Sequence, residues 1–160
     1  MSNVETLMNH LEANAREELA AQDRFLAILD DQEQAILAGR SEGVLTASKS
    51  IETESAGSAR RAASRKRLLK GISEAWRVPV DAMTLGSIAE RAGARGAPLV
   101  DLRRDLRNKA NEVALKNKRV ASVARLHHHV IREVINTIFR DEEGGYLEGD
   151  AAGALIDAEA

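Results

Sequence analysis

The sequence contains no cysteine, which excludes disulfide bonds and thiolate metal sites. Aromatic residues make up only 2% of the chain, and its two prolines lie outside the long periodic stretches. No apolar run reaches the roughly 18 to 20 residues that a membrane-spanning helix needs. The N-terminal residues lack the basic region and apolar run of a signal peptide. We therefore expect a soluble, cytoplasmic protein without membrane insertion.

The residues that dominate this chain favour helices. Ala, Leu, Glu and Arg have high helix propensity, and no stretch alternates with the period of two that strands require. We predict an all-α fold, an elongated antiparallel helical bundle or coiled coil of three long helices plus one short helix. The predicted helices cover about residues 4–38, 41–76, 84–92 and 98–140. Residues 1–140 would form a single domain, followed by a mobile acidic tail at 141–160.

Local signals set the predicted helix ends. Gly39 can adopt the left-handed conformation that ends a helix, and Ser41 can cap the next one. Pro79 forces the residue before it out of the helical region. Thr84 is a candidate cap for the short helix, and Pro98 suits the first turn of the last helix.

Apolar residues recur with helical spacing in each long segment. The stripe of the first helix is interrupted near Glu18 and Gln22, and the middle of the second helix, residues 55–64, is rich in Ala, Ser and Gly. These small residues either let backbones approach closely or leave a weak, mobile segment. The last helix has a seven-residue repeat, which favours coiled-coil packing. Its members are Leu99, Leu106, Val113, Val120, His127 and Val134.

The most hydrophobic part of the chain is residues 130–139, which are apolar on more than one face. Either both other long helices contact this segment, or part of it is an exposed surface for a partner. The candidate binding residues are Val130, Ile131, Val134, Ile135 and Ile138.

Groups suited to catalysis or metal binding are scarce. His127, His128 and His129 point about 100° apart on a helix, so they cannot all coordinate one ion. The only other histidine is His10, and no nucleophile motif or Gly-rich phosphate loop is present. We expect no enzymatic activity, no metal and no cofactor.

The net charge of −2 conceals an uneven distribution. Basic residues cluster within residues 60–70 and 103–109, whereas the chain from Asp141 onward has no Lys or Arg. We interpret the clusters as solvated helix faces, because no aromatic residues are interleaved to stack on bases. Nucleic acid is therefore not an expected partner.

The order of these features resembles the FlgN-type flagellar export chaperones, a family of helical proteins of type III secretion. The similarity includes the phrase at residues 33–39, which ends the first helix, and the short Leu-x-x-Ile-Ala insert at residues 85–89. Val120 stands where the family often has a second Asn. Further matching positions are Leu45, Lys49, Arg65, Leu68, Leu69, Leu99, Leu102, Leu106 and Asn117, which looks buried.

The resemblance implies a chaperone that binds the C-terminal helical segment of hook-associated proteins, prevents premature assembly and delivers them to the flagellar export gate. Residues 130–138 would then contact the client, and Tyr146 in the tail would be the candidate contact to the export gate. The alternative is a structural or adaptor coiled-coil protein that forms a homo-oligomer through the same apolar stripe and has no client.

Overall fold

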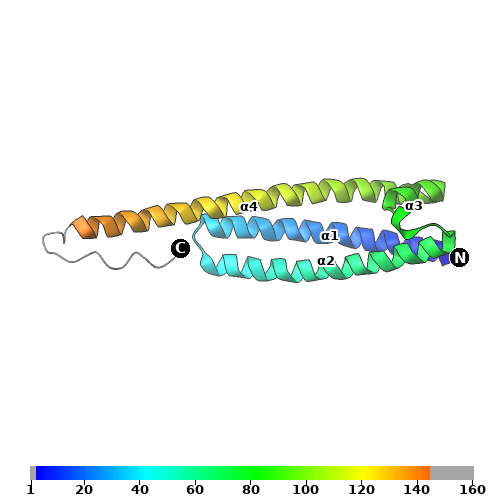
Figure 1. The fold of residues 1–160 in the computed structure, drawn as a ribbon, viewed down its shortest axis with the longest axis horizontal. Helices are drawn as coiled ribbons and strands as arrows, with labels where there is room; N and C mark the ends of the chain where they lie inside the picture. The colour runs from blue at the N-terminus through cyan, green and yellow to red at the C-terminus, as the bar shows by residue number, and fades with distance from the viewer. Residues whose placement is uncertain (1–2, 145–160) are drawn as a thin grey trace. The chain divides into compact units, whose positions relative to one another are not determined.

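The computed structural model describes residues 3–144, including the side chains of residues 3–139. Within this range the chain is all-α and contains no strand, as predicted. Three long helices make up most of this range, with a short helix and two 3-10 turns between the second and third of them. Figure 1 labels the four α-helices. The elements are α1 (Asn3–Leu37), α2 (Ser41–Trp76), η1 (Val80–Ala82), α3 (Leu85–Ala92), η2 (Gly93–Gly96) and α4 (Ala97–Gly144).

The chain forms two compact units that divide between Val123 and Ala124. The N-terminal unit contains α1, α2, α3 and the first part of α4, and the C-terminal unit begins with the rest of α4. That helix includes residues 141–144, where the sequence predicts the start of the tail. The remainder of the predicted tail lies outside the described residues.

Helices α1 and α2 form an antiparallel hairpin with a tight turn at Gly39 (Figure 1). Gly39 has a φ of 66°, which confirms the predicted left-handed end of the first helix. The Gly39 amide donates to the Ile36 carbonyl and the Arg40 amide to the Ala35 carbonyl, which are the two bonds of a Schellman motif. The predicted cap at Ser41 is wrong, because Arg40 is the cap residue and no side chain bonds there. The two Schellman hydrogen bonds stabilise this turn without a capping bond from the Ser41 hydroxyl.

The connection between α2 and α4 follows its local signals. Arg77 is left-handed, with a φ of 54°, and ends α2 just before Val78 and Pro79. Thr84 caps α3 as predicted: its hydroxyl accepts from the Ser87 amide at 3.0 Å, and the Ser87 hydroxyl accepts from the Thr84 amide at 2.9 Å. This reciprocal capping box satisfies two amides that the first turn of the helix leaves free.

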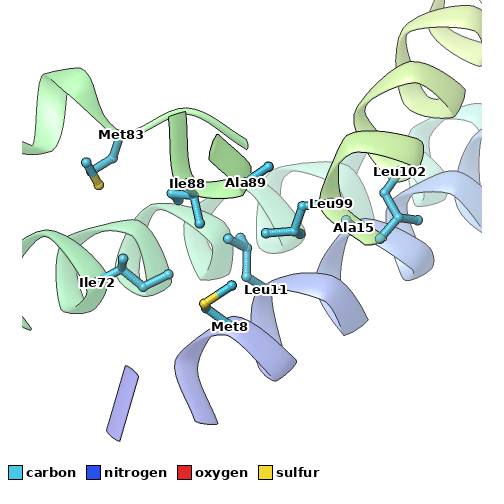
Figure 2. Close-up of a cluster of buried hydrophobic side chains, with 9 residues drawn as sticks. All are labelled: Met8, Leu11, Ala15, Ile72, Met83, Ile88, Ala89, Leu99 and Leu102. Carbon is cyan, nitrogen blue, oxygen red and sulfur yellow. The ribbon is translucent and has the colours of Figure 1, made fainter. Parts of the chain in front are cut away.

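The core of the N-terminal unit lies where α1, α2, α3 and α4 meet. Figure 2 shows that its side chains converge from all four helices. Gly96 is required here, since a Cβ at that position would lie 2.1 Å from the Ala89 carbonyl oxygen. The buried cluster comprises Met8, Leu11, Ala15, Ile72, Met83, Ile88, Ala89, Leu99 and Leu102.

Beyond the core, α4 is joined to α1 by ion pairs between long side chains. Lys109 lies 3.0 Å from Asp23, and seven residues later Lys116 pairs with both Asp30 and Glu33. Arg119 binds the second oxygen of the Glu33 carboxylate. Lys109 and Lys116 recur every seven residues because α4 presents the same face to α1 at that interval.

The apolar repeat of α4 faces inward in the N-terminal unit. Leu99 and Val120 are buried, and Leu106 and Val113 between them are half-buried. Asn117, which looks buried in the sequence, is exposed. Its neighbour Lys116 instead reaches α1, because a long cationic side chain can span the gap to the α1 carboxylates.

The buried carboxylate of Glu33 makes the stability of the N-terminal unit depend on pH in the acidic range. Hydrogen bonds from Lys116, and then from Arg119, hold the pKa of Glu33 below its ordinary value of 4.5. A carboxyl whose pKa is lowered by folding contributes stability above the unfolded pKa. That contribution is lost as the pH falls through the folded pKa.

We expect Glu33→Gln to lower the free energy of unfolding at neutral pH and to flatten its decline below about pH 5. Urea unfolding followed by circular dichroism at several pH values measures both effects. Glu52→Gln, at an exposed position of α2, is the matched control and should keep the wild-type slope. An unchanged acid slope in Glu33→Gln would contradict the role given to this carboxylate.

The interruption of the α1 stripe at Glu18 is explained by an ion pair across the hairpin. Arg61 is buried, although its position in a basic cluster suggests a solvated residue, and its Nε donates to Glu18 at 2.7 Å. A cavity of about 380 Å³ lies beside the pair, lined by Ala21, Phe25, Ser55, Ser58, Ala59, Ala62 and Val113 among others.

We expect Arg61→Ala to cost about 2 kcal/mol of stability, because it leaves the mostly buried Glu18 carboxylate without its cation. The double variant Glu18→Leu with Arg61→Leu should recover most of this loss, since an apolar pair needs no charge compensation. Arg24→Ala is the control, because Arg24 pairs with Glu54 at a half-exposed position and its removal should cost much less stability. Thermal unfolding measures the stability of all three variants. A double variant less stable than Arg61→Ala would contradict the role given to the Arg61–Glu18 ion pair.

Candidate functional site

The candidate site is the exposed apolar face of α4 in the C-terminal unit. All five predicted binding residues lie on this continuous helix, and their exposed fractions range from 45% to 53%. The sequence left two possibilities for this segment, burial between helices or exposure. The structure shows exposure for all five residues, Val130, Ile131, Val134, Ile135 and Ile138.

These side chains occupy one broad arc of the helix. At about 100° per residue, the five residues fall within an arc of about 140°. Leu126 and Phe139 extend the two edges of the arc and are also exposed, at 64% and 61%. They were missing from the predicted set, although both are apolar and border the same arc. The face is wider than the narrow seam of a two-stranded coiled coil.

The same seven-residue repeat is covered in one unit and bare in the other. Val120 is 5% exposed in the N-terminal unit, whereas Val134, two repeats later, is 53% exposed in the C-terminal unit. A helix that keeps an apolar repeat where its side chains face water is typical of a surface that binds a partner.

Polar residues occupy the rest of the helix surface. Arg132, Glu133 and Asn136 are exposed, and the Thr137 hydroxyl donates to the Glu133 carbonyl at 2.8 Å. The apolar arc itself carries no charged residue between Val130 and Phe139. A partner that fits this arc would present an apolar stripe with polar edges.

The histidines give no reason to assign a metal. His127 is half-buried, and His128 and His129 are exposed. No group of three or more His, Asp or Glu side chains suited to a metal ion occurs in the part of the chain that the structure describes. In that part of the chain, no helix combines the length and apolar character needed to cross a bilayer.

Tyr146, the candidate contact to an export gate, lies outside the described residues. Comparison of the chain with protein families, with curated proteins and with solved structures finds no match.

Proposed function

We propose that this protein is a non-catalytic chaperone that binds an amphipathic helix of a client on the exposed face of α4. The observation that carries the proposal is the bare apolar arc from Val130 to Ile138 on a continuous helix. A client helix laid along this arc would remove apolar surface of both partners from water, at about 25 cal/mol per Å². The same contact would hide client surface that otherwise aggregates or assembles early.

The resemblance to flagellar export chaperones supplies the proposed client. In that reading the client is the C-terminal helical segment of a hook-associated protein. The protein acts in the cytoplasm and releases its client at the export gate, with Tyr146 as the contact. The helix boundary at Gly39 and the short insert at residues 85–89 are the features that support this choice.

A self-associating coiled coil without a client is the second candidate function. The seven-residue repeat of α4 supports it, because an identical copy could cover the same arc. The two functions differ in what covers the face. A chaperone exchanges its client, whereas a scaffold covers the face permanently with another copy.

Co-expression with C-terminal segments of hook-associated proteins, followed by size-exclusion chromatography with light scattering, tests the proposal. We expect a complex of defined stoichiometry that contains one or more copies of this chain and a client segment. A stable homo-oligomer that takes up no client segment would reject the chaperone and favour the scaffold.

A further inference from the structure

A strip of unneutralised cations runs along the outer face of α2. Arg60, Lys66, Arg67 and Lys70 are exposed and fall within an arc of about 120° at 100° per residue. Lys70 has a loose ion pair with Glu74 at 3.8 Å, between two strongly exposed side chains. The other three form no ion pair within the described side chains, residues 3–139.

Cations on neighbouring surfaces of the N-terminal unit are compensated. Arg24 binds Glu54, Lys109 binds Asp23, and Arg104 lies within 3.1 Å of both Asp101 and Asp105. The second basic cluster, on α4, is therefore partly neutralised by its own neighbours. The strip on α2 differs because exposed alanines, Ala56, Ala59 and Ala63, lie among its charges instead of carboxylates.

The complementary charge is present in the same chain. Residues 141–160 contain seven Asp and Glu and no Lys, Arg or His. Residues 1–140 hold all 23 Lys and Arg against the other 18 acidic residues. The net charge of −2 is therefore the sum of an excess of basic residues in 1–140 and an excess of acidic residues in 141–160. Charges arranged in this way attract one another over about one Debye length, roughly 10 Å at 0.1 M salt.

We propose that the cationic strip of α2 is a docking surface for the acidic residues 141–160 of a second copy of this chain. The strip holds no aromatic side chain on which bases could stack, so an acidic polypeptide suits it better than a nucleic acid. The proposal does not depend on the identity of any client.

A second copy is favoured by the course of α4 in the N-terminal unit. Arg95 contacts Glu12, Lys109 contacts Asp23 and Arg119 contacts Glu33, so α4 runs parallel to α1. Arg61, inside the stretch that carries the strip, lies level with Glu18. Glu33 lies about 20 Å along α1 from Glu18, so within the N-terminal unit residue 119 of α4 is already about that far along the helix axis from the level of Arg61.

Carbodiimide cross-linking of a mixture of unlabelled and ¹⁵N-labelled full-length chains tests the proposal. This reagent joins a Lys amine directly to a carboxylate that contacts it. We expect mixed-isotope peptides that link Lys66 or Lys70 to acidic residues of 141–160. They should disappear near 1 M salt, where the Debye length falls to about 3 Å.

Charge reversal supplies the matched variants. Arg60→Glu with Arg67→Glu should abolish the mixed-isotope links, whereas Arg107→Glu with Lys118→Glu makes the same net change at exposed positions of α4 and should leave them. Mixing the strip variant with a Glu142→Lys, Glu143→Lys chain should restore links with reversed polarity. All four substituted strip and control positions are exposed, so circular dichroism should show unchanged helicity.

Three results would overturn the proposal. Links confined to single-isotope peptides would place the acidic residues on their own chain. Links that persist in the strip variant would place them on another surface. An absence of links, together with oligonucleotide binding that the strip variant loses, would assign the strip to nucleic acid.

Discussion

We expect the double substitution Ile131→Asp with Val134→Asp to abolish client binding while the protein keeps its helicity. Both side chains lie in the exposed arc of α4, and a client helix would cover them. Burying each apolar side chain contributes about 1.5 to 3 kcal/mol, and a carboxylate in the same place must be desolvated without a partner. The combined effect is a loss of affinity of about 100-fold or more. Isothermal titration with the client segment measures it.

The control for this variant adds the same two charges to the other side of the helix. His129→Asp with Asn136→Asp changes two exposed residues outside the apolar arc. It should bind the client segment with an affinity close to that of the unmodified chain. If the arc variant stays folded and binds normally, or if both variants lose binding equally, the face is not the site.

The largest expected effect on stability comes from Leu11→Ala. Leu11 is fully buried at the centre of the cluster to which all four helices contribute, so its truncation leaves a cavity that the rigid neighbours cannot fill. Substitutions of this kind cost about 2 to 5 kcal/mol. For a chain of this length the corresponding fall in melting temperature is on the order of 10 °C.

Leu115→Ala removes the same atoms from a side chain that is 67% exposed on α4. It should change the stability by less than about 0.5 kcal/mol. Thermal unfolding of both variants by circular dichroism makes the comparison. Equal losses in the two variants would show that the cluster around Leu11 is not the core of the N-terminal unit.

The features that the sequence predicts well are those set by near neighbours along the chain. Gly39 ends α1 because a left-handed residue there completes two local hydrogen bonds, and Thr84 caps α3 through a residue only three positions away. Pro79 keeps Val78 out of the helical region for a steric reason contained in one dipeptide, although left-handed Arg77 already ends α2 one residue earlier. The all-α class follows from the same local terms, summed over the long helices.

The features that the sequence misses depend on which residues meet across helices. Arg61 looked like one cation of a solvated cluster, yet it is buried because Glu18 of α1 lies opposite. Lys116 reaches Glu33 and Asp30, while Asn117 beside it is exposed. The seven-residue repeat of α4 predicts where its apolar side chains lie on the helix. It does not predict that Val120 is buried in the N-terminal unit while Val134 is exposed in the C-terminal unit, because burial depends on contacts that the repeat does not encode.

For the candidate face, too, some features follow from the sequence alone and others do not. Hydrophobicity alone located Val130 to Ile138, and helical geometry extends the arc to Leu126 and Phe139. The identity of the partner is a separate inference. It comes from the resemblance to export chaperones and is independent of the observed exposure.

Site-specific photo-cross-linking tests the central claim most directly. A photoreactive residue at position 134 would lie inside the apolar arc, and one at position 129 would lie on the opposite side of the same helix. With a client segment present, we predict cross-links to that segment from position 134 and none from position 129. Cross-links from position 129 alone, or from neither position while the complex remains intact, would contradict the account.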